Sequence, residues 1–307
     1  MRYLYQIAGL RVLCEIPYPL TIHKESEAFL FPLPDEQMLP EIDLTFRFCP
    51  VESLPAQRAA PYSVSCREYV EMEDAWYVYH CATPHAAPYA CVVWPLDGSQ
   101  VVTCWYLPGK EHYLNFSRNI GDLLGLETLL WHWNGLLLHA SFIRWNGQGI
   151  LFSAPSGTGK STQADLWVRY KGAEILNGDR AALRRCGRQW TAYGLPYAGS
   201  SGIYRNECAP VAALVVLRQA ADNRIRPLSA VEAVCHLYPE ITIHRWDRRF
   251  TEQALHLLTQ LLADVPVYLL ECRPDREAVE MLGAVLETMS AKGEHPRDEN
   301  TGGTTDY

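Results

Sequence analysis

The sequence predicts an α/β domain preceded by a β-rich domain. Three observations support this: short aromatic and β-branched runs broken by Pro and Gly up to about Arg118, alternating strand and helix patterns beyond it, and a glycine-rich turn between a strand and a helix. The chain of 307 residues is 48% hydrophobic and 20% charged, which is the balance of a globular protein with a substantial core.

Residues 1–118 are predicted to form a β-rich accessory domain. Its clearest strands lie at residues 10–16, 75–80 and 100–106, where aromatic and β-branched side chains predominate. Aromatic side chains in strands belong to the core more often than to a ligand site. No motif in this part indicates a particular chemistry.

Residues 119–289 are predicted to form the α/β domain, and the polar, Gly-rich tail 290–307 is expected to be disordered. A helix with leucines at helical spacing opens this domain, so a fragment beginning near Arg118 is expected to fold alone. The expected helices are 120–133, 160–170, one opening at the capping box Ser229–Glu232, 251–263 and 275–289; the expected strands are 149–153, 173–177, the hairpin 182–193, 212–217 and 267–270.

Charge and composition exclude several classes of partner. The formal net charge is −8 and no Lys/Arg-rich face is apparent, so we expect no nucleic-acid partner. The first residues lack the pattern of a signal peptide and no run of 18 apolar residues occurs, so we expect a cytoplasmic protein with no membrane partner. The ten cysteines are scattered without a C-x-x-C pair, which favours free thiols over a metal or disulfide site.

The glycine-rich turn at residues 154–161 has the pattern of a phosphate-binding loop. Such a loop directs several backbone N–H groups and a helix N-terminus at one anion, which predicts binding of ATP or a related nucleotide. Lys160 would reach the β- and γ-phosphates and Ser161 would bind Mg²⁺. The pattern starts with Ala154 where glycine is usual, so that position must avoid positive φ or carry strain. The predicted nucleotide-binding residues are Ser156, Gly157, Thr158, Gly159, Lys160, Ser161 and Thr162.

A second acidic element follows only 17 residues after Ser161, at Asp179. An acid at the end of the strand expected next to the loop strand would lie beside the γ-phosphate. There it would hold Mg²⁺ or accept a proton from a hydroxyl.

These motifs together resemble the HPr kinase/phosphorylase family, whose fold is shared with the nucleotide-binding part of phosphoenolpyruvate carboxykinases. The resemblance spans about residues 136–271 and looks closest to HPr-kinase-like proteins found with bacterial peptide-modification systems. It implies a P-loop phosphoenolpyruvate carboxykinase/HPr kinase-like fold for the second domain. The segments that carry it are 138–141 (Leu-His-Ala-Ser), the loop, 177–179 (Asn-Gly-Asp) and 202–206 (Gly-Ile-Tyr-Arg-Asn).

The family pattern has two adjacent acids where this chain has Gly178 and Asp179. In one alignment Gly178 replaces the acid that serves as base, which leaves Asp179 on the metal side. In the other alignment Asp179 is the first acid and Arg180 replaces the second. The resemblance also makes His139 a candidate near the transferred phosphate, although a core role is about as common. Arg205 is a candidate phosphate contact, and its alternative is a surface ion pair.

The leading hypothesis is therefore an ATP- and Mg²⁺-dependent kinase that transfers the γ-phosphate to a hydroxyl, expected to be Ser or Thr of a peptide or small protein. The predicted catalytic residues are Asp179, Lys160, His139 and Arg205, the predicted metal ligands are Ser161 and Asp179, and residues 1–118 are expected to recognise the acceptor. A small-molecule kinase and a non-catalytic nucleotide sensor remain alternatives. A homo-oligomer is also left open.

Overall fold

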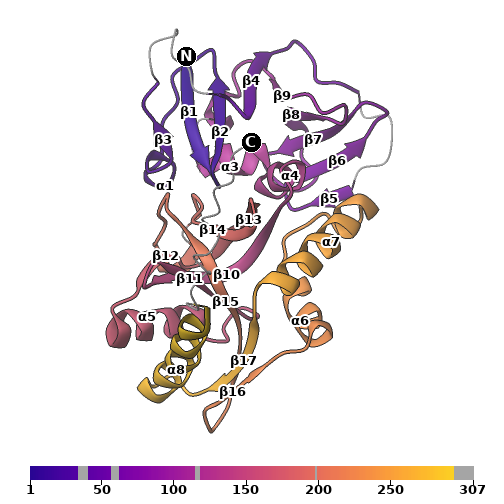
Figure 1. The fold of residues 1–307 in the computed structure, drawn as a ribbon. Coiled ribbons are helices and arrows are strands. Elements are labelled where there is room, and N and C mark those ends of the chain that lie inside the picture. Colours follow the sequence, from indigo (N-terminus) through magenta and orange to yellow (C-terminus); the bar gives the residue numbers. More distant parts are fainter. Residues whose placement is uncertain (34–40, 57–61, 115–117, 198, 294–307) are drawn as a thin grey trace, which may run out of the picture.

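The computed structural model describes residues 1–33, 41–56, 62–114, 118–197 and 199–293. It is a mixed α/β structure in which two large sheets occupy opposite halves of the molecule (Figure 1). The tail that is predicted to be disordered lies outside the described part of the chain from residue 294 onward.

The first half is a nine-stranded sheet, as its β-rich sequence predicts. Its strand order is β3-β1-β2-β4-β9-β8-β7-β6-β5, and its pairs are antiparallel except for β2–β4 and β4–β9. The strands are β1 (Arg2–Ile7), β2 (Leu10–Glu15), β3 (Leu30–Phe31), β4 (Leu44–Pro50), β5 (Tyr62–Val64), β6 (Arg67–Glu71), β7 (Ala75–Cys81), β8 (Pro88–Pro95) and β9 (Val101–Tyr106), and a short helix α1 (Lys24–Glu27) precedes β3.

Three short helices connect the halves: α2 (Glu111–Leu114), α3 (Arg118–Leu124) and α4 (Leu126–His132). The single helix expected over residues 120–133 is interrupted at Gly125, whose φ of 70° is favourable for glycine and strained for other residues. The leucines of α3 and α4 lie in the same core as the first sheet. The same core contains Leu137, Ala182 and Leu195 of the second half, and α4 also packs on β10 and α7, so these helices join the two halves.

The second half is organised around two long strands, β10 (Gly135–Trp145) and β15 (Cys208–Gln219). Each of them pairs along one part of its length with a strand of the hairpin β13–β14 and along the other part with the loop strand β11. The remaining strands are β11 (Gln148–Ser153), β12 (Glu174–Asn177), β13 (Arg180–Cys186), β14 (Gln189–Tyr193), β16 (Arg224–Pro227) and β17 (Val267–Cys272).

β10 also corrects one expectation about the site. The sequence analysis did not identify this strand, and it lies between β11 and β12, pairing with both. The strand that leads to Asp179 is therefore not the direct neighbour of the loop strand. The two are still close, because the Ala140 N–H of β10 donates a hydrogen bond of 3.0 Å to the Asp179 carbonyl.

Helices cover both faces of this second sheet, and they come from the expected segments (Figure 1). The helices α5 (Lys160–Lys171) and α8 (Arg276–Gly293) pack on one face, and α6 (Ala230–Leu237) and α7 (Arg248–Asp264) pack on the other. The capping box at Ser229 and Glu232 is present at the start of α6. The last helix ends at Gly293, beyond the predicted limit of Met289. In the described part of the chain, no helix is long and apolar enough to cross a bilayer.

A fragment that begins near Arg118 was expected to fold alone. Because α3 and α4 share a core with the first sheet, we now expect it not to fold. A fragment of residues 119–293 would expose Leu124, Leu126, Leu129 and Leu130, which are at most 1% exposed in the whole chain. At roughly 1.5–3 kcal/mol for burying each such side chain, full exposure of the four would cost about 6–12 kcal/mol, which is comparable to the whole stability of an ordinary domain. We expect the fragment to aggregate in size-exclusion chromatography, with residues 1–293 as control. A monomeric, cooperatively unfolding fragment would contradict this packing.

Candidate functional site

The glycine-rich turn forms an open loop between β11 and α5. Gly157 and Gly159 have φ values of 80° and 113°, which only glycine adopts readily. Ala154 is not among the residues with positive φ, so its replacement of the usual glycine carries no backbone strain. Gly159 is the N-cap of α5 and offers no side-chain acceptor, so the first N–H groups of the helix remain available to an anion.

Lys160 is held against the loop rather than extended into solvent. Its ammonium donates hydrogen bonds to the carbonyls of Ala154 (2.7 Å) and Pro155 (3.4 Å), and the residue is 7% exposed. Burial lowers the pKa of Lys160, while the nearby carboxylates of Glu240 and Asp179 act in the opposite direction. The lysine is therefore placed between the loop carbonyls and two acids.

The turn that carries Asp179 is fixed by Asn177, a fully buried residue that the sequence analysis did not assign a role. The Asn177 side-chain oxygen accepts from the N–H groups of Asp179 and Arg180, both at 2.9 Å. Its amide nitrogen donates to the carbonyls of Leu195 (2.9 Å) and Tyr197 (2.8 Å). With all four bonds made, the carboxamide fixes the backbone turn that carries Asp179.

His139 lies between two carboxylates. Its Nδ1 is 2.7 Å from Glu240 Oε2, and its Nε2 is 3.8 Å from Asp179 Oδ1. Glu240 is a site residue that sequence reasoning missed, because it is 101 positions from its partner and follows no motif. It arrives there because the next residues pair with β10: the Thr242 N–H donates to the Leu137 carbonyl, and Ile241 bridges Leu138.

The structure does not bring Arg205 to this cluster. Its guanidinium is nearly half exposed and lies 3.9 Å from Glu174 and 3.7 Å from Glu207, so it is part of a surface ion-pair group. The cation that does lie beside Asp179 is Arg180, whose Nε is 3.4 Å from Asp179 Oδ2. The other predicted residues, from Ser156 to Thr162, together with His139 and Asp179, lie on or next to the loop.

Gly178 faces a neighbouring turn rather than the phosphate loop. A Cβ atom at this position would lie 2.0 Å from Ser201 Oγ and 2.4 Å from Ser201 Cβ. A Cβ atom added at Gly199 would lie 2.6 Å from the Asp179 Cβ. The turn Gly199–Ser201 therefore covers both Gly178 and Asp179. An acid introduced at Gly178 would meet this turn before it could reach a phosphate.

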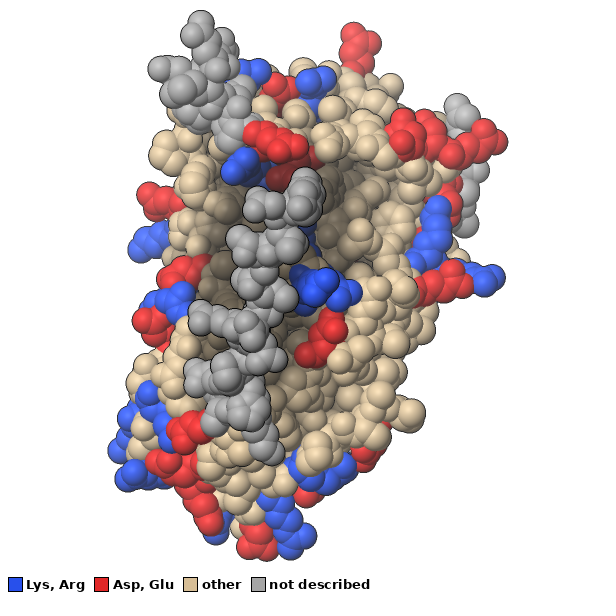
Figure 2. All heavy atoms as spheres, in the orientation of Figure 1, with Lys and Arg blue, Asp and Glu red and all other residues tan. Residues whose placement is uncertain are grey.

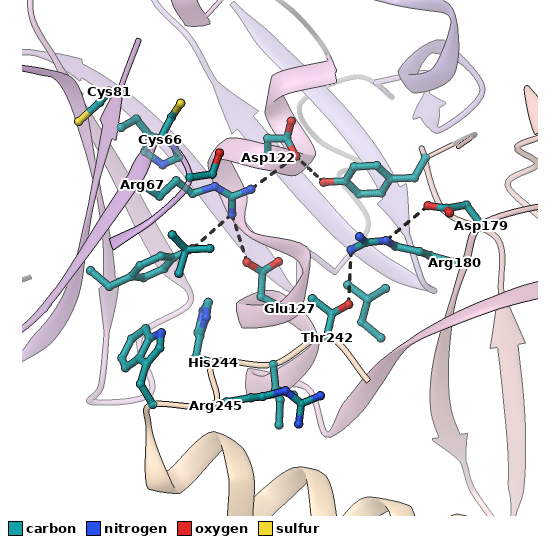
Figure 3. A pocket seen from close by; sticks show the side chains of 18 of the residues that line it. Cys66, Arg67, Cys81, Asp122, Glu127, Asp179, Arg180, Thr242, His244 and Arg245 are labelled. Atoms are coloured by element: carbon teal, nitrogen blue, oxygen red, sulfur yellow. Dashed lines mark hydrogen bonds and ion pairs between the residues drawn. The ribbon is translucent and has the colours of Figure 1, made fainter. Parts of the chain in front are cut away.

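Two cavities lie on different sides of the cluster. One, of about 460 Å³, continues from the loop and is lined by Thr162 and Gln163 of α5 and by the ends of β15 and β17. The other, of about 640 Å³, lies between the two halves of the molecule and includes Asp179 and Arg180 in its wall (Figure 3). Asp179 therefore lies beside His139 of β10 and also lines a cavity to which the first sheet contributes.

Comparisons with known proteins find a family model and a remote likeness to solved structures. A family model described as SynChlorMet cassette protein ScmC matches residues 125–275, a range that contains the loop, His139, Asp179 and Glu240. A solved structure, the Hpr(Ser) kinase/phosphatase from Coxiella burnetii, is 15% identical with a TM-score of 0.31, over 52% of this chain and 92% of that chain. This likeness is remote. No curated protein matches the chain.

The close contact between Gly178 and Ser201 predicts that Gly178→Ala displaces the Gly199–Ser201 turn. We expect a loss of about 1–3 kcal/mol in the free energy of unfolding, the usual cost of overpacking. Urea denaturation measures this loss. Because Ser201→Gly removes the side chain that the alanine would meet, adding Gly178→Ala to Ser201→Gly should cost much less stability than adding it to the wild type. If the single alanine variant is as stable as the wild type, the turn does not lie against Gly178.

Proposed function

We propose that this protein is an ATP-dependent kinase that transfers the γ-phosphate to a hydroxyl group. The observation that carries the proposal is an uncapped helix start with Lys160 after a glycine-rich turn, together with Asp179, which lies 3.8 Å from His139 on the strand next to β11 and lines a cavity large enough for an acceptor. Phosphoryl transfer needs little beyond positioning and charge neutralisation, and both are features of this arrangement.

The residues present fit a bound nucleotide and magnesium ion. The uncapped start of α5 and the two positive-φ glycines suit the phosphates, and the cavity beside Thr162 suits the remainder of the nucleotide. Among the described residues no group of three or more His, Cys, Asp or Glu could hold a metal, but Mg²⁺ in nucleotide sites uses one or two protein ligands plus phosphates. Ser161 and Asp179 would hold the ion, which supplies neutralisation of phosphate charge when bound.

The transfer step assigns the acceptor proton to the acidic cluster. The acceptor oxygen forms a bond to the γ-phosphorus, the bond from that phosphorus to the leaving ADP oxygen breaks, and the hydroxyl proton passes to Asp179. His139, hydrogen-bonded to Glu240, lies 3.8 Å from Asp179, so this pair lies directly behind the reacting carboxylate. We therefore propose one acid at the reaction centre with a His–Glu pair behind it, in place of two adjacent acids.

A second candidate, a nucleotide-binding sensor without transfer activity, is favoured by the position of Gly178. In the alignment where Gly178 replaces the acid that serves as base, that position is packed against Ser201 and the base is missing. Transfer of phosphate to any acceptor decides between the two functions.

Asp179→Asn is expected to reduce kcat by about 10² or more, the usual scale for removing a general base, with much less change in nucleotide affinity. Single-turnover transfer from labelled ATP to a hydroxyl acceptor measures this. Glu240→Gln should give a smaller loss and a shifted pH profile, because it changes the partner of His139 rather than the reacting group.

Asp165→Asn is the matched control, since Asp165 is an exposed acid of α5 away from the cluster. Wild-type transfer rates in Asp179→Asn would show that this carboxylate is not catalytic. The kinase proposal would then lose its main support.

A further inference from the structure

The cavity between the two halves has a composition that indicates its occupant. Its wall combines β6 and β7 of the first sheet, the helices α3 and α4, and the segment 242–246, with Asp179 and Arg180 at the end next to the phosphate loop (Figure 3). The space-filling view shows a hollow between the two halves on this side of the molecule (Figure 2).

Two side chains in this wall have unused hydrogen-bonding capacity. His80 is 5% exposed, and its Nε2 is buried with no partner among the described residues. Its cross-strand neighbour Arg67 uses only Nη1 in its hydrogen bonds within the described part of the chain, to Glu127 (3.1 Å) and Tyr69 (3.3 Å). Arg67 Nη2 lies 3.7 Å from Asp122, beyond a normal hydrogen bond. A buried donor without a partner is costly, so a ligand with acceptor groups suits this wall.

The charges in the cavity wall balance. Three arginines face three carboxylates, and burial lowers the pKa of His80 to about 3 and also lowers that of His244, so both are neutral at pH 7. A strongly anionic or cationic ligand would leave charges uncompensated, whereas an uncharged polar segment would not. The charged residues concerned are Arg67, Arg180, Arg245, Asp122, Glu127 and Asp179.

A second cavity, of about 490 Å³, adjoins the first at Tyr69 and Trp246. Its wall combines four aromatic residues with two acids and two arginines, whose charges balance. Among the aromatic residues, Tyr62 stacks on Trp246 with ring centroids 4.5 Å apart and planes within 7°, and Trp76 lies 5.1 Å from Trp246. Each cavity alone has the size of a small-molecule site, roughly 300–1,000 Å³. Two adjoining cavities suit an occupant longer than a single small molecule, and the aromatic residues suit an aromatic side chain.

We propose that the two cavities form an acceptor groove for an uncharged peptide segment, with its Ser or Thr hydroxyl at Asp179 and an aromatic side chain of the same peptide against Tyr62 and Trp246. This inference rests on the proposed kinase function and selects a peptide over a small-molecule acceptor. Backbone carbonyls of the peptide accept from Arg67 Nη2, which makes no hydrogen bond within the described part of the chain.

The test uses synthetic peptides with blocked ends, each made of Gly and Ala with one Ser, in which a single Phe is moved through every other position. Each peptide is incubated with Mg²⁺ and labelled ATP, and L-serine, L-threonine and glycerol are tested in parallel. We expect transfer to the peptides, with KM lower by about tenfold or more for particular Phe positions. Equal KM values for all Phe positions would overturn the proposal.

The variants locate the groove. Tyr62→Ala should raise the KM for the preferred peptide about tenfold and leave the KM for ATP unchanged, while Tyr62→Phe should behave as wild type because it keeps the ring stack. Phe31→Ala is the matched control: Phe31 is 48% exposed and Tyr62 54%, on opposite edge strands of the same sheet. An unchanged KM for the peptide in Tyr62→Ala would contradict the groove.

The tests with small-molecule acceptors show whether a negative result contradicts the peptide groove alone or the kinase function as well. Phosphorylation of L-serine, L-threonine or glycerol without any peptide would overturn the groove and leave the kinase function intact. If neither kind of acceptor is phosphorylated, the kinase function fails, and the peptide groove fails with it.

Discussion

The buried carboxamide of Asn177 joins the segments on which the candidate site depends. Its four hydrogen bonds connect the turn of Asp179 and Arg180 to the loop that carries Leu195 and Tyr197. Such a fully satisfied buried group is rigid, and removing it would leave several backbone groups unpaired at once. The backbone turn that carries Asp179 is thus held by a buried residue of β12.

The same network extends from the phosphate loop to the cavity between the halves. Tyr197, whose carbonyl accepts from Asn177, donates its hydroxyl to Asp122 at 2.7 Å, and the Arg180 guanidinium lies 5.8 Å from the Tyr197 ring centroid. Asp122 is on α3, which packs with the first sheet. The β-rich half is therefore connected to the site by packing and by polar contacts, as expected if both halves contribute to acceptor binding.

The sequence predicted most elements of the second half because their signals are local. The loop, the hairpin turning at residues 186–188 and the capping box at Ser229 each depend on a few adjacent residues, and the structure has all three. β10 was missed because its apolar run, Leu136 to Leu138, gives no period that separates strand from helix.

Long-range features could not be read in this way. Glu240 reaches His139 only because residues 241 and 242 pair with β10, and no local pattern encodes that contact. Arg205 had a plausible motif position, but the segment before β15 places its side chain beside Glu174 and Glu207. The packing of α3 and α4 on the first sheet likewise depends on tertiary contacts, since their helical leucine spacing suits either half of the chain.

The central claim is that the glycine-rich turn with Lys160 binds the phosphates of Mg²⁺·ATP. Calorimetric titration of Mg²⁺·ATP into Lys160→Ala tests it most directly, with Lys110→Ala, an exposed lysine outside the site, as control. We expect Lys160→Ala to lose most of the nucleotide affinity and to keep the circular dichroism spectrum of the wild type. Lys110→Ala should bind Mg²⁺·ATP with wild-type affinity. Wild-type affinity in Lys160→Ala would contradict the phosphate-loop assignment and the kinase function built on it.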